Sequence, residues 1–381
     1  MEETLAALRA EINTVNQQLT DLLVRRLNLA EQVADCKQQQ QLPLLDAGRE
    51  RQILNEMAQR AGAECAYETK MLFSELFELS RMRQRRRLLA NTPLATKIDY
   101  ALAATPPEFP KMATFIACQG VEGSYGQQAC DRLFFKPNIL YFNQFADVFN
   151  AVEKGMCSYG VLPIENSIAG SVTQVYDLMR EHHFYIARSI KQRLDHALLA
   201  RPHTTIADVR EILSHEQGLR QCANFLTNFR SVKITAVENT AVAARLVAAS
   251  ERRDLAAISS ARCAEIYGLT PLRTDLTVNN YTRFICITRH LEIYPGANRV
   301  SLMLTLPHRA GSLNRIIARF AALGLNLLKI ESRPISGKDF EFMFYFDIEA
   351  SAFEAPTRML LGDLSVELPM CEFLGNYTEM A

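Results

Sequence analysis

The first 90 residues carry a long apolar stripe and almost none of the residues that interrupt helices. Apolar side chains recur every three or four residues from about Thr4 to Gln38, and residues 1–90 hold only two of the chain's 16 glycines and one of its 14 prolines. At about 1.5 Å per residue, the predicted helix is roughly 50 Å long. A domain of this size cannot bury so long a stripe within itself, so we expect the helix to pair with a second copy of the chain.

Two further helices are expected after this stripe. Pro43 and Gly48 mark a break, and helical patterns then run from about Arg49 to Ala61 and from about Tyr67 to Leu89. Residues 91–111 contain four prolines among small side chains, which predicts a linker.

Polar residues recur at helical spacing on this scaffold. Arg26 and Lys37 project from one face, because the eleven residues from one to the other span about three helical turns. Arg9 falls about 100° away, so it serves the same pocket only from a partner chain. Ser80 and Gln84 share a face one turn apart. The ordinary alternative is that these side chains are solvated charges on amphipathic helices.

In order and spacing, these residues resemble the AroQ-type chorismate mutase domain over about residues 5 to 90, so residues 1–90 are the first predicted domain. The resemblance implies an all-helical, intertwined dimer that holds a dianion through a pericyclic rearrangement. It implies that Lys37 and Gln84 donate to the ether oxygen and that Glu50 holds the ring hydroxyl. The chorismate-binding residues that it implies are Arg9, Arg26, Lys37, Asp46, Arg49, Glu50, Ser80 and Gln84.

From residue 112 onward, short apolar strands alternate with helices. This alternation predicts an α/β fold with its ligand at the carboxyl ends of the strands. A glycine-rich turn at Gln119–Gly126 leads into a helix and offers N–H groups to an anion, but it lacks the GxGxxG spacing of a dinucleotide site. Strands are expected at Tyr159–Ile164, Ala197–Ala200, Glu211–His215 and Leu255–Ile258.

Polar residues follow several of these strands, and Thr282, Arg283 and Phe284 precede another. The last three place a hydroxyl, a guanidinium and an aromatic ring in consecutive positions, which suits chemistry on a carboxylate. Each polar group taken alone is also explained as an ordinary cap or turn.

Together these motifs resemble the prephenate dehydratase domain over residues 112–289. The resemblance implies two α/β lobes around a cleft, similar to type 2 periplasmic binding proteins, and the loss of CO2 and the ring hydroxyl from prephenate. Thr282 would serve the departing hydroxyl and Arg283 would anchor the substrate, with Glu165 or His215 as candidate proton sources. The implied prephenate contacts are Glu165, Asn166, Ser167, Ser214, His215, Gln217, Gln221, Thr240, Arg283 and Phe284.

Residues 298–377 show a βαββαβ pattern, which is typical of a ferredoxin-like fold. Its last helix is expected at Phe353–Leu361 and its last strand at Val366–Leu374. With Arg309–Leu313 and Glu331–Pro334, the segment resembles an ACT domain of the phenylalanine-binding kind; for the first motif, a plain structural turn is the alternative. The allosteric contacts that the resemblance implies are Gly311, Ser312, Leu313, Glu331 and Ser332.

Composition narrows the partners, cofactors and location that we expect. A net charge of zero argues against a nucleic-acid partner, and no apolar run approaches the length of a membrane span. The first residues lack the pattern of a signal peptide, so we expect a cytoplasmic protein. Nine cysteines without a CxxC pair predict reduced thiols, and neither a metal nor a cofactor is expected.

The order of the three domains resembles the bifunctional chorismate mutase/prephenate dehydratase family. It implies an enzyme of phenylalanine biosynthesis that turns chorismate into prephenate and prephenate into phenylpyruvate, inhibited by phenylalanine. A homodimer is expected and a tetramer is left open. The alternatives are a monofunctional prephenate dehydratase with an inactive mutase domain and a non-catalytic metabolite sensor.

Overall fold

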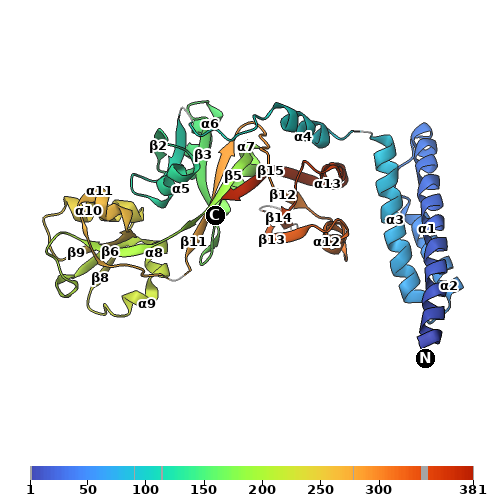
Figure 1. Cartoon of the computed structure of the whole chain (residues 1–381), viewed down its shortest axis with the longest axis horizontal. Helices are drawn as coiled ribbons and strands as arrows, with labels where there is room; N and C mark the ends of the chain where they lie inside the picture. The colour runs from blue at the N-terminus through green and yellow to red at the C-terminus, as the bar shows by residue number, and fades with distance from the viewer. Residues whose placement is uncertain (1, 90, 113–114, 278, 336–341, 381) are drawn as a thin grey trace. The chain divides into compact units, whose positions relative to one another are not determined.

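The structure is a computed structural model that describes residues 2–89, 91–112, 115–277, 279–335 and 342–380. It divides into two compact units (Figure 1). Met1–Thr96 and Met359–Glu367 form the first, here called the helical unit, and Lys97–Arg358 and Leu368–Ala381 form the second. None of the helices in the described ranges combines the length and the apolar character that crossing a membrane requires.

Three helices build most of the helical unit: α1 (Glu2–Gln39), α2 (Ala47–Ala61) and α3 (Ala66–Leu88), close to their expected bounds. The third packs against the other two (Figure 1). The apolar stripe of α1 is not covered within one chain. Its members are 44–60% exposed, and they are Leu5, Leu8, Ile12, Val15, Leu19, Leu22, Leu29 and Val33.

The stretch expected to be a linker contains a further helix, α4 (Pro93–Ala104). Thr92 caps it by accepting from the Ala95 N–H at 3.2 Å, and the buried side chains of Ile98 and Ala101 share one face. A proline is tolerated in the first turn of a helix, because the N–H that it lacks has no partner there. Pro93, one of the four prolines that predicted a linker, therefore begins a helix.

The second unit contains a large sheet of ten strands in the order β13-β14-β12-β15-β5-β11-β3-β1-β2, with β4 paired to β3. β1, β2 and β3 run parallel, and β11 lies antiparallel between β3 and β5. The elements of its first part are β1 (Ile116–Gln119), α5 (Tyr125–Leu133), β2 (Ile139–Phe142), α6 (Phe145–Glu153), β3 (Tyr159–Asn166), β4 (Gly170–Ser171), α7 (Thr173–His182), β5 (Tyr185–Arg193) and β11 (Tyr281–Thr288).

A second sheet of five strands has the order β10-β6-β9-β7-β8. Helices α10 and α11 cover one face, and α8 and α9 cover the other (Figure 1). The four strands expected at Tyr159, Ala197, Glu211 and Leu255 are all present. The elements here are β6 (His196–Ala200), a 3-10 turn (Ile206–Asp208), β7 (Glu211–His215), α8 (Glu216–Gln221), α9 (Ala223–Leu226), β8 (Lys233–Val237), α10 (Thr240–Ala249), β9 (Leu255–Ser260), α11 (Arg262–Tyr267) and β10 (Thr270–Arg273).

The remaining part of the large sheet, here called the C-terminal sheet, has the strand order β13-β14-β12-β15 and the expected ferredoxin-like βαββαβ connectivity. The predicted break after Leu361 is wrong, because buried Leu360 and Leu364 continue the apolar face of α13 and place Val366 within the helix. The elements are β12 (Arg299–Thr305), α12 (Ser312–Ala322), β13 (Asn326–Pro334), β14 (Phe342–Glu349), α13 (Ala355–Glu367) and β15 (Met370–Met380).

Candidate active sites

A cleft of about 380 Å³ lies between the two sheets of the second unit. This volume is within the usual range for a small-molecule site. Its wall combines polar, aromatic and aliphatic side chains. The lining residues are Gln119, Tyr125, Phe145, Pro163, Asn166, Val172, Leu194, His196, His215, Gln217, Gly218, Gln221, Glu238, Asn239, Thr240, Thr282 and Phe284.

The hydroxyl of Thr282 faces this cleft from β11 and is held by an amide. Its oxygen lies 2.9 Å from Nδ2 of Asn166, the residue opposite it on β3. The amide orientation follows from its other partners, because Asn166 Oδ1 accepts from the N–H groups of Ile168 and Ala169 at 3.0 and 2.9 Å. Asn166 therefore donates to Thr282, and the Thr282 proton is available to a molecule in the cleft.

The series of hydrogen bonds continues from Asn166 to Gln221 of α8 and His196 of β6. Gln221 donates to Asn166 Oδ1 at 3.2 Å and accepts at Oε1 from Asn280 Nδ2 at 2.9 Å. Because Oε1 is an acceptor, its 2.8 Å contact with His196 requires a proton on Nε2. The Tyr125 hydroxyl then donates to His196 Nδ1 at 3.1 Å. These contacts select the neutral Nε2–H tautomer of His196.

Burial lowers the pKa of both cleft histidines below the ordinary value. For His196 the hydrogen bond with Gln221 opposes this effect, and for the half-buried His215 the charge of Glu216 opposes it. Both imidazoles are therefore neutral at neutral pH. In the described part of the chain, no three His, Cys, Asp or Glu side chains gather as a metal site would require.

His196 was not among the residues predicted for the site, and strand direction explains why. The rule that ligands lie at carboxyl ends of strands holds for parallel strands such as β7, which ends at His215. β6 runs antiparallel to β9, with His196 opposite Ser260, so the start of β6 lies at that same edge. A histidine directly before an apolar strand was the only signal in the sequence.

Two helices begin at this cleft. Tyr125 opens α5 behind the cap Ser124, and Thr240 opens α10 behind the cap Asn239. The N–H groups of a helix N-terminus carry partial positive charge and bind carboxylates. Among the described residues that line the cleft, none is lysine or arginine, and one, Glu238, carries a carboxylate. The groups at this cleft that suit an anion are helix termini and neutral donors.

Seven of the residues predicted for the dehydratase site line the cleft and four do not. Ser214 donates to a backbone carbonyl of β9 at 2.7 Å, and Ser167 donates to a backbone carbonyl at 3.0 Å. Glu165 and Arg283 lie on the face of the large sheet away from the cleft. The seven are Asn166, His215, Gln217, Gln221, Thr240, Thr282 and Phe284.

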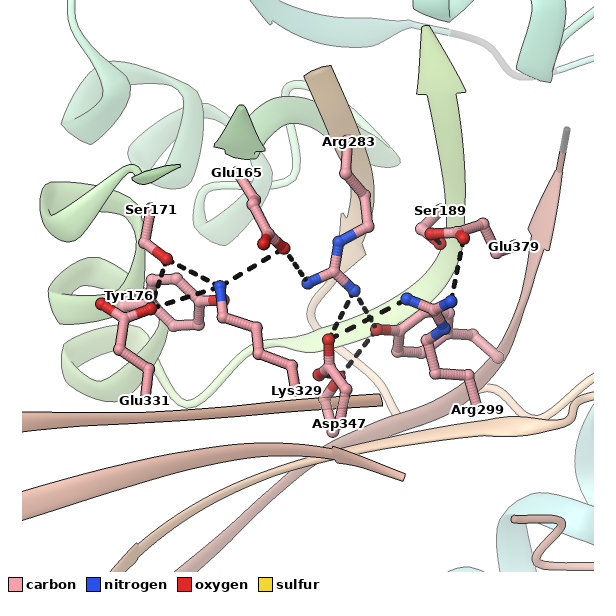
Figure 2. A network of polar contacts seen from close by, with 12 residues as sticks. Glu165, Ser171, Tyr176, Ser189, Arg283, Arg299, Lys329, Glu331, Asp347 and Glu379 are labelled. Atoms are coloured by element: carbon pink, nitrogen blue, oxygen red, sulfur yellow. Dashed lines mark hydrogen bonds and ion pairs between the residues drawn. The ribbon is translucent and has the colours of Figure 1, made fainter. Parts of the chain in front are cut away.

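Arg283 points away from the cleft because successive side chains of a strand alternate between faces. Its guanidinium lies 2.9 Å from Glu165 of β3 and 2.6 Å from Asp347 of β14 (Figure 2). Lys329 of β13 lies 3.3 Å from both Glu165 and Glu331. Arg283, expected to anchor a substrate, is 8% exposed and is paired with two carboxylates of the protein.

The helical unit brings together several residues predicted to bind chorismate. Arg26 of α1 donates to Ser80 Oγ and, at 2.9 Å, to a backbone carbonyl of α3, and it lies over the ring of Phe77. Burial lowers the pKa of Arg26, an effect that Glu50 opposes. Gln84 is buried one turn beyond Ser80, and among the described residues its Oε1 has no hydrogen-bond partner.

Four other predicted residues have partners inside the helical unit. Lys37 donates to the backbone carbonyl of the loop after α1 at 2.6 Å. Glu50 forms an ion pair with Arg81. Asp46 caps α2 by accepting from the Arg49 N–H at 2.9 Å, which leaves both residues at an exposed helix end.

Arg9 lies apart from this group. It is exposed and precedes Arg26 by 17 residues on the same helix, which is roughly 25 Å at 1.5 Å per residue. A side chain cannot bridge that distance within one chain.

The residues expected to bind phenylalanine lie on two elements of the C-terminal sheet. Gly311–Leu313 form the start of α12, where the glycine has a left-handed φ of 81°. Glu331 and Ser332 are consecutive on β13 and so point to opposite faces. Glu331 accepts from the Ser171 hydroxyl and pairs with Arg333 at 2.7 Å, whereas Ser332 is exposed.

Comparison with known proteins separates the same two regions. Residues 8–85 match the family model for chorismate mutase type II, and residues 116–292 match the model for prephenate dehydratase. A bifunctional chorismate mutase/prephenate dehydratase of Escherichia coli (strain K12) is 30% identical, over 99% of this chain and 96% of that protein.

Two further similarities concern the second region alone. Arogenate dehydratase/prephenate dehydratase 2, chloroplastic, of Arabidopsis thaliana is 37% identical over 69% of this chain and 72% of its own length. Among solved structures, a prephenate dehydratase from Arthrobacter aurescens in complex with L-Phe is 26% identical with a TM-score of 0.63, over 70% of this chain and 90% of that one.

Proposed function

Because this chain belongs to the bifunctional chorismate mutase/prephenate dehydratase family, we propose that it converts chorismate to prephenate in the helical unit and prephenate to phenylpyruvate in the cleft. The observation that carries the second activity is the Thr282 hydroxyl, oriented by Asn166 with its proton available to the cleft. Neither reaction, as proposed, requires a cofactor.

The mutase reaction needs a pocket that holds a dianion in a compact conformer and stabilises charge on the ether oxygen. Arg26 is suited to grip a carboxylate, since guanidinium groups bind carboxylates in a bidentate manner. Gln84 has a buried amide whose oxygen finds no partner among the described residues, and it is suited to turn its N–H group to the ether oxygen. In our proposal Lys37 leaves its backbone carbonyl to make the second such bond.

The mutase pocket is completed by a second copy of the chain. The exposed stripe of α1 would be buried against its counterpart, and antiparallel pairing of two long helices would carry the partner's Arg9 toward the pocket of Arg26. Support for this intertwined dimer comes from the roughly 25 Å that separates the two arginines within one chain.

In the dehydratase reaction, prephenate loses CO2 and its ring hydroxyl, and aromatisation drives both departures. In our proposal the Thr282 O–H donates to the departing hydroxyl, and the hydrogen bond that its oxygen accepts from Asn166 makes it a stronger donor. The carboxylates lie against the N-terminal ends of α5 and α10, while Phe145 and Phe284 pack on the ring. Desolvation of the carboxylate in this cleft favours its loss as CO2.

A departing hydroxide requires a proton from beyond Thr282, because a threonine hydroxyl is a poor acid near neutral pH. Of the two candidates, His215 lines the cleft, whereas Glu165 is held on the other face by Arg283 and Lys329. His215 Nδ1 accepts from the Gln217 N–H at 3.2 Å, so its proton is on Nε2. We propose that His215 relays a solvent proton: it takes one up at Nδ1 as it gives its Nε2 proton to the departing hydroxide, so that the imidazole stays neutral and the hydroxide leaves as water.

We further propose that residues 298–377 are an ACT domain that binds phenylalanine and slows a two-lobed dehydratase domain at residues 112–289. The left-handed Gly311 exposes N–H groups at the start of α12, where they suit a carboxylate. Glu331, a carboxylate that pairs with Lys329 and Arg333, is the candidate partner for the ammonium of the amino acid. The L-Phe bound to the Arthrobacter enzyme supports this choice of effector.

One assay tests these proposals together. Purified protein is given chorismate or prephenate, and phenylpyruvate is measured with and without phenylalanine. Product from both substrates and inhibition by phenylalanine are expected. Product from prephenate alone would favour a monofunctional dehydratase, and no product from either would favour a metabolite sensor.

Arogenate is a second candidate substrate of the cleft. It carries an ammonium where prephenate carries a keto oxygen, and the described lining includes Glu238 but neither lysine nor arginine. The Arabidopsis relative is named for both dehydratase activities. Incubation with arogenate would yield phenylalanine directly; absence of phenylalanine beside normal turnover of prephenate rejects this candidate.

A further inference from the structure

Two adjacent residue pairs of the β3–β11 ladder serve opposite faces of the sheet. Thr282 pairs with Asn166 on the cleft side, and the next pair, Arg283 and Glu165, lies on the other side. A register shift follows at once, between Arg283 and Phe284. The two pairs are consecutive in the chain on both β3 and β11, so the backbone position of one pair constrains that of the other.

This ladder ends at the cleft. Asn166 is the last residue of β3, and Thr282 is the second residue of β11. Strand ends open more readily than strand centres, because fewer ladder bonds hold them. The Thr282 hydroxyl must nevertheless stay within hydrogen-bond reach of a reacting atom, and small misplacements lower catalytic rates strongly. Pairing with β5 and a bond from the Ser167 N–H hold the backbone at this end, and a restraint on the side chains would fix it further.

The ion pairs behind the ladder supply that restraint. The Arg283 guanidinium bridges Glu165 on the neighbouring strand and Asp347 on β14, 2.9 and 2.6 Å away (Figure 2). Asp347 is 5% exposed and also accepts from the hydroxyl of Ser301 on β12. Arg283 is thereby held between the strand that carries Asn166 and the C-terminal sheet.

The group of charges around Arg283 is balanced. Lys329 shares the carboxylate of Glu165 and also contacts Glu331, whose other partner is Arg333. Asp347 also lies 4.0 Å from Arg299, which pairs with Glu379, so the group holds four cations and four carboxylates. Removing one member leaves a buried charge without compensation, which is far costlier than replacing a whole pair. The arrangement is therefore rigid around Arg283.

We propose that Asp347 is a positioning residue for the dehydratase reaction, acting through Arg283 and Glu165 on the Thr282–Asn166 pair. The C-terminal sheet thus contributes to turnover itself, in addition to the regulation proposed above. This inference rests on the proposed dehydratase activity. It also gives Arg283 and Glu165 a role behind the site in place of direct contact with prephenate.

The test is steady-state kinetics with prephenate on the full chain carrying Asp347→Asn or Glu165→Gln. Loss of positioning lowers kcat by about tenfold or more and leaves KM within about twofold, since the cleft lining is intact. Asp347→Glu, which restores the charge, recovers part of kcat. Asp254→Asn is the matched control, because its pair with Arg252 lies at the start of β9, away from the ladder.

Each outcome decides the question. Activity of the wild-type chain on prephenate tests the proposed function, so its absence is distinguishable from failure of this inference. With an active wild type, kcat within about twofold in both variants overturns the inference, as does a raised KM with unchanged kcat, which would mean substrate contact. If Asp347→Asn does not fold, the partly exposed Glu165→Gln decides alone.

Discussion

The cleft and the helical pocket are proposed for the same kind of doubly negative substrate, yet they are built in different ways. In the cleft, the side chains from Tyr125 to Thr282 form a continuous series of hydrogen bonds within one polypeptide. In the helical unit, Gln84 has an unpaired oxygen among described residues and Arg9 is remote. A site that is complete in one chain and a site that needs two should respond differently to changes at the subunit contact.

The largest expected effect concerns the cleft alone. Thr282→Val removes the hydroxyl while keeping the shape, and we expect dehydratase kcat to fall by about a thousandfold, as when a donor to a developing oxyanion is lost. Thr282→Ser keeps the hydroxyl and should retain much of the rate. Mutase activity on chorismate is the internal reference and should not change. Full dehydratase activity in the valine variant would remove Thr282 from the mechanism.

The next effect separates the two sites. A double change of Ile12→Glu and Leu19→Glu places charge in the exposed stripe of α1, where a partner helix would have to bury it. Mutase activity should fall by about a hundredfold as the dimer dissociates, because the partner's contribution is lost, while dehydratase turnover stays within about twofold. Sedimentation or size-exclusion chromatography measures the dimer.

Changing the exposed Tyr100→Ser, which lies outside the stripe, is the control. A variant that becomes monomeric and keeps its mutase rate would show that the helical site is complete in one chain.

A smaller effect concerns acid stability of the cleft. Because the fold lowers the pKa of His196, the unfolded chain takes up a proton first as the pH falls below about 6.5. The stabilisation is complete above that pH and is lost progressively below it. Each pH unit between the unfolded and folded pKa values lowers the free energy of unfolding by about 1.4 kcal/mol.

Thermal melts of the second unit from pH 8 to pH 5 measure this loss. His196→Gln keeps a donor where Nε2 lies and should make the melting temperature fall less steeply between about pH 6.5 and pH 5. His215→Gln should change it less, because His215 is only half-buried. An equal slope in wild type and the His196 variant would contradict the neutral tautomer.

The smallest effect lies in the C-terminal sheet. Gly311→Ala introduces a side chain at a φ of 81°, where nothing lies within 4 Å of the new Cβ, so the cost is backbone strain of about 1 kcal/mol. Phenylalanine should inhibit severalfold more weakly, with both uninhibited activities retained. Gly324→Ala, with a φ of 68° and equally open space at the other end of α12, is the matched control. Undiminished inhibition in the Gly311 variant would place the effector elsewhere.

The long helices could be predicted almost to the residue, because period and length together leave few alternatives for α1 and α3. Short elements were harder. Helix α13 continues through Gly362 to Glu367, because buried Leu360 and Leu364 extend its apolar face beyond the predicted end.

Residues at the site could be predicted less well than the fold. Consecutive residues in a motif are not neighbours in a site, because Thr282 and Arg283 point to opposite faces of a strand. His196 could not be found from strand ends, since the direction of β6 is a property of the sheet and not of the local sequence. Its partners Gln221 and Tyr125 lie 25 and 71 residues away in the chain.

Strand β15 has a consequence for how the protein is made. Thr378 pairs in parallel with Arg188, so β5 acquires its second neighbour only after 190 further residues have been synthesised. Gly375 passes so near the Ile186 carbonyl that any added Cβ would lie 2.5 Å from its oxygen. A nascent chain released before this point would expose an open edge of β5 and tend to aggregate. The large sheet is thus completed only after Thr378 has been translated.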